Sequence, residues 1–454
     1  MPRRKTLPAP ASPAMQTLTF GPLLRHVPRA TVQALLTAHG RDNAYACKLP
    51  ALLMVYYLIA LSLQRALPTR EVWRWLLDGL RTVWGAARLP ATVAGKAALA
   101  MARTRLGPDV LAAVFAACAR PLATAATQGA WALGYRLVAL DGTVLAVPDT
   151  PANAAAFGYA GSKHGPSAFP LVRVVGLVEL GTHAVIGTAL GANRASEVAL
   201  ADALLPTLQP DMLCLADRLY FSRVRWAAAA ATGAALLWRL ADDVRLPVEQ
   251  ELPDGTYLTT VTPGCRARVI TYTLPGVPGS APAYRLLTTL CDPAAAPAAT
   301  LAALYHARWE AESVLDELKT HLRGGDQALL RSLTPAGVRQ EGYGLLLAHY
   351  VVRAVMHDAA LQADRDPDTL SFVHTVRVIR RVLPQAAALP PSAVVTLVPE
   401  ATGGSAGRAR GEQPWHPPPP RYPPQIVPTP ETPPGRLPPP AARSDTGGVP
   451  PKPS

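Results

Sequence analysis

The sequence predicts a mixed α/β protein in which an all-helical N-terminal region precedes a core of strands and helices. Three observations support this class. Residues 19–131 repeat Ala, Leu and Val at intervals of three and four, which is the spacing of one helix face. Residues 135–240 instead contain short apolar runs bounded by turn residues, which is typical of strands. Residues 296–383 return to helical spacing, ahead of a proline-rich tail at 384–454 that we expect to be disordered.

The N-terminal region begins with a basic leader. Residues 1–18 carry three cations but no apolar stretch after them, so we expect a disordered leader and no secretory signal. The most apolar segment, Leu49–Leu63, is shorter than the roughly 20 residues that span a bilayer, and it is predicted to be a buried helix. The helices of 19–131 are expected to start or end near prolines, namely Pro50, Pro68, Pro90, Pro108 and Pro121.

Composition narrows the function classes. The 454 residues carry a formal net charge of +13, which favours a polyanionic partner, nucleic acid first and an acidic membrane surface second. The cysteines have no CxxC spacing, which argues against a zinc site or a disulfide framework and for a reducing compartment. We expect a soluble cytoplasmic, nucleoid-associated protein that does not bind membranes. The five cysteines are Cys47, Cys118, Cys214, Cys265 and Cys291.

The core has a recognisable order of elements. A strand over 136–140 runs into Asp141, and a strand over 212–216 runs into Asp217. The order β-β-β-α-β-α-β, with acids at the ends of the first and fourth strands, is the ribonuclease-H-like arrangement. A β-rich insertion is predicted at about 243–292. The other expected core elements are strands at 169–179, 184–190 and 234–240, and helices from Ser196-Glu197 to Pro206 and over 221–232.

The stretch 304–319 contains no Gly or Pro and is predicted to be a helix. At 100° per residue, its polar residues Tyr305, Arg308, Glu312 and Lys319 fall within about 60° of arc beside an apolar stripe. A solvated face with i,i+4 ion pairs is the competing interpretation, although Glu312 and Lys319 are too far apart for such a pair. The helix by itself does not decide between site and surface, and Asp316 competes with Glu312.

On the same predicted helix, Glu310 and Glu317 fall on the side opposite the arc that contains Glu312.

The three acids Asp141, Asp217 and Glu312 together predict a metal centre. Carboxylate oxygens suit Mg²⁺ or Mn²⁺, and two such ions can activate a water or a 3′-hydroxyl for phosphoryl transfer. Taken singly, Asp141 is also explained by an Asx turn and Asp217 by a helix cap. The set of three is the stronger signal.

At this point the chain resembles the DDE transposases of the insertion element 4 family over residues 20–385. The resemblance rests on Leu140-Asp141-Gly142-Thr143, on Ala216-Asp217-Arg218-Leu219-Tyr220, and on the family's Y-R-E-K signature. That signature is present at its full spacing as Tyr305-x2-Arg308-x3-Glu312-x6-Lys319, and it favours Glu312 over Asp316.

The resemblance implies a role for each matched residue. It implies that Asp141, Asp217 and Glu312 hold two catalytic Mg²⁺ or Mn²⁺ ions, and that Tyr305, Arg308 and Lys319 bind phosphates of the transposon end. Arg218 is either a further phosphate contact or a structural partner of Asp217. The implied domains are the helical DNA-binding domain 19–131 and the ribonuclease-H-like catalytic domain 132–383.

The activity implied is binding of terminal inverted repeats, metal-dependent strand cleavage and transfer to target DNA, with a dimer forming on DNA. The chain departs from the family at Leu219, where Gly is common, at Leu171, where Gln is usual, and in its proline-rich tail. A catalytically inactive, transposase-derived DNA-binding protein is the alternative. A Ser/His hydrolase built on Ser196 or His349 is disfavoured because the chain has no Gly-x-Ser-x-Gly elbow.

Overall fold

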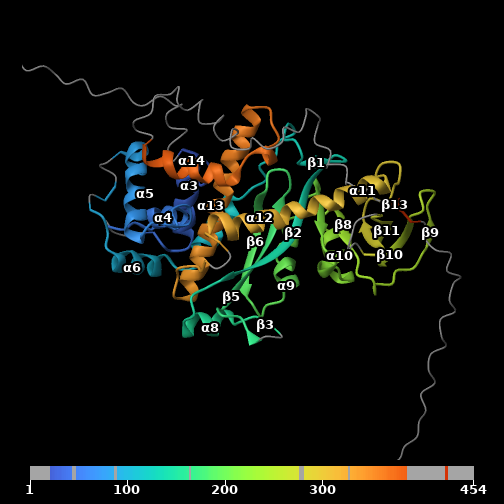
Figure 1. Cartoon of the computed structure of the whole chain (residues 1–454), viewed down its shortest axis with the longest axis horizontal. Coiled ribbons are helices and arrows are strands. Elements are labelled where there is room, and N and C mark those ends of the chain that lie inside the picture. The colour runs from blue at the N-terminus through green and yellow to red at the C-terminus, as the bar shows by residue number, and fades with distance from the viewer. Residues whose placement is uncertain are drawn as a thin grey trace, which may run out of the picture.

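The computed structural model describes residues 21–42, 48–85, 89–90, 92–162, 165–275, 281–325, 328–385 and 425–427. The expected basic leader and nearly all of the expected proline-rich tail lie outside these residues. In the described part, the N-terminal helices gather at one end of the molecule, the central strands lie in the middle and a group of later strands lies at the other end (Figure 1).

The N-terminal helices begin at prolines where the sequence predicts it. Pro50 and Pro68 are the N-caps of two of them, a position that needs no backbone donor. Helical structure ends at Cys118 and not near residue 131 as expected, since the segment after it consists of turns and irregular backbone that lead to the sheet. The helices are α2 (Gly21–His26), α3 (Arg29–Ala38), α4 (Ala51–Leu63), α5 (Thr69–Trp84), α6 (Lys96–Leu106) and α7 (Val110–Cys118).

The central sheet is mixed. Strand β2 (Tyr135–Ala146) pairs antiparallel with β5 (Leu171–Glu179) on one side, and β5 pairs antiparallel with β6 (Ala184–Ala192). On its other side β2 pairs parallel with β7 (Met212–Ala216), which pairs parallel with β8 (Ala235–Arg239). The first five core strands therefore lie in the order 3-2-1-4-5.

Short elements connect these strands. Between β2 and β5 come α8 (Pro151–Phe157) and the small hairpin of β3 (Gly161–Ser162) and β4 (Gly165–Pro166). Between β6 and β8 come α9 (Glu197–Asp202), the 3-10 turns η2 (Leu205–Thr207) and η3 (Arg218–Tyr220), and α10 (Arg223–Ala230).

The β-rich stretch after β8 extends the same sheet. Strand β12 (Tyr284–Thr288) pairs antiparallel with β8, and β11 (Cys265–Thr273), β10 (Tyr257–Thr262) and β9 (Gln250–Glu251) follow in that order. Strand β13 (Gln425–Ile426) pairs with β11 at Tyr272 and Thr273, which differs from the disorder expected of the whole tail. The three residues 425–427 contain no proline, so their backbone N–H groups are available for pairing.

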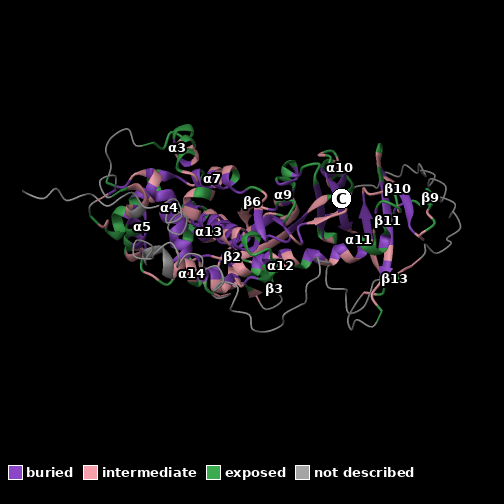
Figure 2. Cartoon of the chain, turned by 90° about the horizontal axis from the view of Figure 1, so that it is seen from above, coloured by how far each residue is buried: buried purple, intermediate pink, exposed green. Residues whose placement is uncertain are grey.

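Alternating residues of the central strands build two apolar layers. Leu137 and Ala139 of β2 belong to a hydrophobic cluster shared with the N-terminal helices and the C-terminal helices, while Val138 and Leu140 face a second cluster with α9 and α10. Figure 2 shows this buried interior running through the central strands and into α4 and α13. The C-terminal helices are α11 (Ala298–Tyr305), α12 (Trp309–Asp316), α13 (Pro335–Gln362) and α14 (Phe372–Gln385), with the 3-10 turn η6 (Pro367–Thr369) between the last two.

The contact between α4 and α13 joins the N-terminal helices to the rest. Nearly every residue of α4 is buried, as predicted for the apolar segment Leu49–Leu63. At Gly344 of α13 the two helices approach so closely that a Cβ would lie 2.7 Å from the Leu58 carbonyl oxygen. A side chain at this position would therefore push the helices apart.

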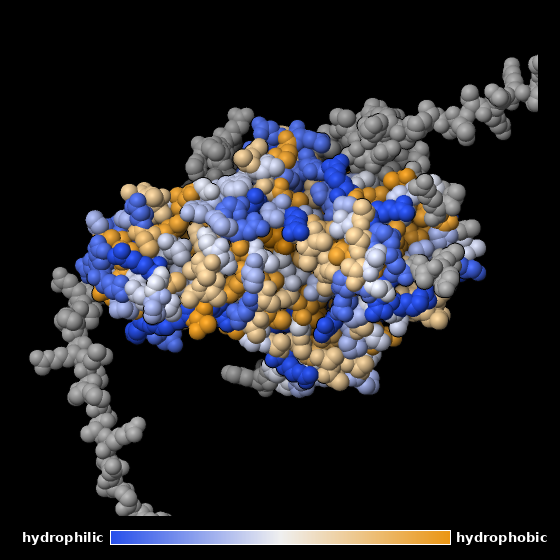
Figure 3. All heavy atoms as spheres, turned by 180° about the vertical axis from the view of Figure 1, so that it is seen from behind, coloured by the Kyte–Doolittle hydropathy of each residue, from blue (hydrophilic) through white to orange (hydrophobic). Residues whose placement is uncertain are grey.

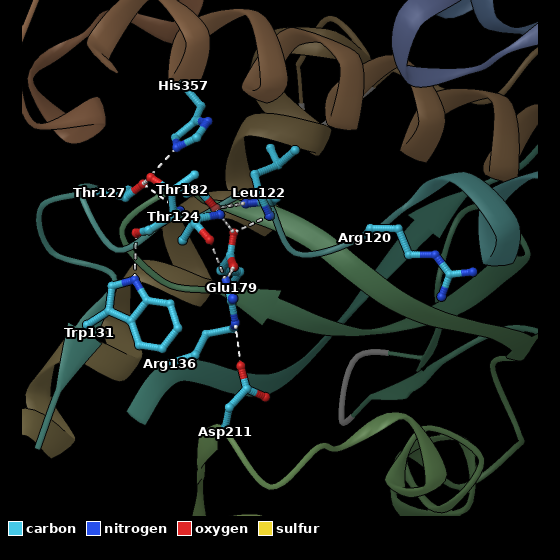
Figure 4. Close-up of polar contacts among 12 residues, drawn as sticks. Arg120, Leu122, Thr124, Thr127, Trp131, Arg136, Glu179, Thr182, Asp211 and His357 are labelled. Carbon is cyan, nitrogen blue, oxygen red and sulfur yellow. Dashed lines mark hydrogen bonds and ion pairs between the residues drawn. The ribbon is translucent and has the colours of Figure 1, made fainter. Parts of the chain in front are cut away.

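A buried carboxylate ties the segment after α7 to the sheet. Glu179, at the end of β5, accepts hydrogen bonds from the backbone N–H groups of Leu122 and Ala123 at 2.9 and 3.0 Å and pairs with Arg136 of β2 (Figure 4). The short strand β1 (Trp131–Ala132) follows this segment and pairs with β2. Because the Glu179 charge is fully buried, these donors are needed to compensate its lost hydration.

On the face seen in Figure 3, hydrophilic and apolar residues are interspersed across the surface. Among the described residues, no helix combines the length and apolar character needed to cross a bilayer.

Candidate active site

Two neighbouring strands deliver Asp141 and Asp217. Asp217 directly follows β7, as predicted. Asp141 lies inside β2 and does not end it, because β5 pairs with β2 as far as Ala146. The parallel pairing of β2 with β7 stops at Ala139 and Leu215, and continuing that register by two residues places Asp141 beside Asp217.

The helical stretch that carries the signature is not one regular α-helix. A 3-10 turn, η4 (His306–Arg308), separates α11 from α12, and a π-helical turn, η5 (Glu317–Leu322), follows α12. Uniform 100° spacing therefore holds for Arg308 to Glu312 but not as far as Lys319. Breaks of this kind inside a helix often accompany functional sites.

Arg308 lies among the predicted catalytic carboxylates. Its Nη2 donates to Glu312 Oε1 at 2.8 Å, and its Nη1 lies 3.9 Å from Asp141 Oδ1. The Tyr305 hydroxyl, one turn earlier, donates to Asp217 Oδ1 at 3.4 Å. The signature residues Tyr305 and Arg308 thus connect all three acids, from two strands and one helix.

Burial and charge act against each other in this site. Burial raises the pKa of Asp141 to about 6, and the negative charges of Glu312 and Glu197 add to this rise. The positive charge of Arg308 acts in the opposite direction and lowers the pKa of Asp141. Burial works against the Arg308 cation, but Tyr305, Glu312 and Asp217 outweigh it and raise the pKa of Arg308. Burial also raises the pKa of Tyr305, so its hydroxyl stays a proton donor at neutral pH. The site is thus a group of three half-buried acids around one permanent cation.

Lys319 and Arg218 are placed differently from Arg308. Neither side chain forms a hydrogen bond or an ion pair with another side chain in the described part of the chain, so Arg218 is not a structural partner of Asp217. Arg218 is exposed and Lys319 is half-buried. Both cations are therefore available to an external anion.

The donor set suits a hard divalent cation, although the acids are not at ligand spacing. All three groups are carboxylates, the ligand type that Mg²⁺ and Mn²⁺ prefer. Their oxygens are held apart around the guanidinium of Arg308, and in the described part of the chain only His183, Glu310 and Asp368 have ligand atoms all within 4.8 Å of one another. The acids fit a cation at the place where Arg308 now balances their charge.

The cluster of His183, Glu310 and Asp368 lies on the other side of α12. His183 Nε2 is 3.0 Å from Asp368 and 3.4 Å from Glu310, while its Nδ1 is 2.6 Å from Arg353 Nη2. A guanidinium only donates, so Nδ1 is the acceptor and the ring proton sits on Nε2, facing the two carboxylates. An Nε2 that carries its proton cannot ligate a metal, and we interpret the cluster as a hydrogen-bonded network around a neutral His183.

The network contacts α12 through Glu310 and continues to Glu317 in η5. Glu310 accepts from the Gly181 backbone N–H at 2.9 Å, and Glu317 accepts from His349 at 3.0 Å and pairs with Arg353. Both glutamates were expected on the side opposite Glu312, but Glu317 lines the same surface pocket as Glu312, because the π-turn changes the spacing after Asp316. Their partners in α13 and in the β5–β6 turn fix the rotation of the helix that presents Glu312.

Sequence reasoning did not assign Glu197 to the site. In the sequence, Glu197 indicated only the start of a helix. In the structure, the Glu197 carboxylate lies against Gly142, next to Asp141, and accepts from the Tyr220 hydroxyl. A glycine after the first acid and a tyrosine three residues after the second were the available signals.

Comparisons with known proteins agree with this geometry. The family model for a transposase DDE domain matches residues 132–351, and the model for the insertion element 4 transposase N-terminal region matches residues 17–116. The transposase InsG for insertion sequence element IS4 of Escherichia coli (strain K12) is 28% identical over 366 residues, which cover 78% of this chain and 80% of that protein.

Two further similarities are more limited. The putative transposase InsZ of Escherichia coli (strain K12) is 33% identical over 90 residues, covering 20% of this chain and 30% of that protein. A cryo-EM structure of a piggyBac transposase synaptic complex with hairpin DNA aligns with a TM-score of 0.42 and 10% identity, covering 87% of this chain and 86% of that one. The two family models and the long match to InsG are decisive: the chain belongs to the insertion element 4 family of DDE transposases.

Proposed function

We propose that this DNA transposase binds the terminal inverted repeats of its own element, cuts DNA at their ends and joins the freed 3′ ends to target DNA. The observation that carries the proposal is the pair of contacts from Arg308 and Tyr305, which gather Asp141, Asp217 and Glu312 around one site. An inactive DNA-binding derivative would have no need to keep all three acids and both connecting side chains.

Asp141, Asp217 and Glu312 are the residues that would hold the metal, with Mg²⁺ or Mn²⁺ in a two-ion arrangement as the best match to three carboxylates. Bound cations would supply Lewis-acid activation of the attacking water or 3′-hydroxyl and would stabilise the leaving oxygen. The raised pKa of Asp141 reflects an incompletely compensated buried acid, which is the situation in which an added cation is favoured.

The cations beside the acids would position the DNA strand. Arg308 offers a planar fork that matches two phosphate oxygens, and Tyr305 adds a hydroxyl donor. Nearby, Lys319 would contribute an ammonium and Arg218 a second guanidinium. The Arg308 side chain is about one-tenth exposed and sits between Asp141 and Glu312, so a phosphate held there lies directly against the acids.

The order of elements along the chain supports separate DNA-binding and catalytic regions. The 3-2-1-4-5 order of the core strands, parallel only between strands 1, 4 and 5, matches a ribonuclease-H-like core within the catalytic domain 132–383, and the strands of 243–292 extend its sheet. The helical region 19–131 is the proposed DNA-binding domain, and a dimer is proposed to form on paired ends. Phosphate contacts should make DNA binding strongly salt-dependent.

Strand cleavage of an end-containing duplex with Mg²⁺ tests the proposal, comparing the parent with Glu312→Gln. Gln keeps the shape and the ability to accept from Arg308 but loses the charge that holds a cation. We expect binding to the duplex in EDTA to be unchanged and cleavage to fall at least about a hundredfold, the scale of losing a major transition-state contact. Glu251→Gln, on the exposed edge strand β9, is the control.

Two results contradict the proposal. A parent that binds the duplex but never cuts it supports the inactive derivative. Cleavage by Glu312→Gln at the parental rate shows that Glu312 is not a metal ligand.

A further inference from the structure

Glu197 lies at the first position of α9, on the face of the sheet opposite α12. Its Oε1 accepts from the Tyr220 hydroxyl at 2.8 Å and its Oε2 accepts from Arg173 Nη1 at 2.6 Å. About one-fifth of the side chain is exposed. Both carboxylate oxygens are therefore committed to partners within the protein.

The same carboxyl group lies against the strand beside the first catalytic acid. A Cβ built on Gly142 would lie 2.5 Å from Glu197 Cδ and from its Oε1, so only glycine leaves room for the glutamate at this position. Successive residues of a strand face opposite sides, and Asp141 faces α12. Glu197 thus supports β2 from behind, at the residue next to Asp141.

Tyr220 connects Glu197 to the second acid. Its side chain is fully buried, and its backbone N–H donates to the Asp217 carbonyl at 3.0 Å, closing the turn η3 that begins after Asp217. Arg225 also donates to the Tyr220 carbonyl at 3.0 Å. Anchoring the Tyr220 hydroxyl therefore holds the turn from which the Asp217 carboxylate projects.

We propose that Glu197 is a positioning residue, which fixes the separation of Asp141 and Asp217 by joining Gly142 of β2 to Tyr220 of η3. This inference rests on the proposed function, because it assumes that the two aspartates share a cation. Glu197 is not itself a ligand, since it lies on the other face of the sheet and its oxygens bind Arg173 and Tyr220. A residue that supports metal ligands in this way typically changes metal affinity by about ten- to a hundredfold when it is altered.

The competing explanation is an ion pair between Glu197 and Arg173 that stabilises the fold without acting on the acids. The two explanations differ in what Tyr220→Phe does. This substitution removes one hydroxyl and leaves the Arg173 pair and the packing of the ring in place. Only a positioning role predicts that it weakens cation binding.

The test measures Mn²⁺ binding to the full chain without DNA, by the loss of the free Mn²⁺ signal in electron paramagnetic resonance. The variants are Tyr220→Phe, Glu197→Ala and their combination. Glu71→Ala is the matched control, because it also removes a glutamate that pairs with an arginine, but on α5 among the N-terminal helices. Thermal unfolding and DNA binding in EDTA verify that each variant is folded.

We expect Tyr220→Phe and Glu197→Ala each to weaken Mn²⁺ binding about tenfold, with the double variant little weaker than either single one, because both break the same link. Glu71→Ala should bind Mn²⁺ like the parent. Folded variants with parental Mn²⁺ affinity overturn the inference. Mn²⁺ binding that Asp141→Asn leaves unchanged also overturns it, because no cation would then sit between the acids.

Failure of the proposed function is a different result. A parent that binds Mn²⁺ through Asp141 but does not cut DNA refutes the transposition activity, while the Mn²⁺ affinities of the Tyr220 and Glu197 variants still decide the positioning role.

Discussion

Arg308 donates a 2.8 Å hydrogen bond to Glu312 from one helical turn away. The same guanidinium lies 3.9 Å from Asp141, so a single permanent cation balances two acids from different elements. On the proposed function, a divalent cation would compete with Arg308 for these carboxylates, whereas a phosphate would attract Arg308 away from them. We therefore expect the binding of cation and DNA to be coupled through this one side chain.

Arg308→Ala should separate these two effects. Without the competing guanidinium, Mn²⁺ should bind at least as tightly as to the parent, whereas DNA cleavage should fall more than about tenfold because a forked phosphate contact is lost. Mn²⁺ titration and a strand-cleavage assay on the same preparation give both values. Parallel loss of Mn²⁺ affinity and cleavage would show instead that Arg308 is needed to assemble the acids.

Glu317→Gln should destabilise the protein at neutral pH. Burial opposes ionisation, but Arg353 and His349 outweigh it and lower the pKa of Glu317 to about 2. An acid whose pKa is depressed by folding contributes stability above its unfolded value of about 4.5 and loses it as the pH falls toward 2. We expect a loss of about 2–3 kcal/mol in urea unfolding at pH 7, shrinking between about pH 5 and pH 2.

The control for this variant is Glu251→Gln on the exposed strand β9. A pH-independent loss for Glu317→Gln would mean that packing, and not the charge of Glu317, holds the back of α12.

Asp368→Asn should stabilise the protein at pH 8, whereas Glu317→Gln should destabilise it. Burial raises the pKa of Asp368 to about 7 despite the nearby His183, and Glu310 adds to the rise. The unfolded chain ionises this acid near pH 3.8, so the stability of the parent falls as the pH rises from about 4 to 7. The neutral amide removes that penalty.

Because a quarter of the Asp368 side chain is exposed, we expect Asp368→Asn to gain about 1 kcal/mol at pH 8 and nothing at pH 4. Urea unfolding at the two pH values measures this difference. A destabilised variant at pH 8 would show that the ionised Asp368 is a net stabilising partner of His183.

Gly344→Ala tests the contact between α13 and α4. The new Cβ would lie 2.7 Å from the Leu58 carbonyl oxygen, which is backbone and cannot rotate away. We expect a loss of about 1–3 kcal/mol by thermal or urea unfolding, despite the better helix propensity of alanine. Gly161→Ala, where a Cβ meets nothing within 4 Å, should change stability little. Equal effects of the two substitutions would rule out close helix packing as the cause.

Local patterns predicted much of this fold. The apolar run of α4, the span of β7 before Asp217, and the contact of Glu310 with the Gly181 backbone on the side away from Asp141 all follow from side-chain periodicity over one element. Periodicity cannot show where an element stops when a neighbour extends it. Strand β2 continues past Asp141 because β5 pairs with it, and the regular spacing fails beyond α12 because η5 is a π-turn.

The sequence by itself determined the chemistry of the protein: three acids and a Tyr-Arg-Glu-Lys signature at defined spacing, on elements whose type their own residues specify. Only the tertiary structure decided how those groups meet. It placed Arg308 between Asp141 and Glu312, and it set Glu197 behind Gly142 with its carboxylate on Tyr220. Such contacts join residues from separate strands and helices, so they depend on sheet register and helix packing, which no local run of residues encodes.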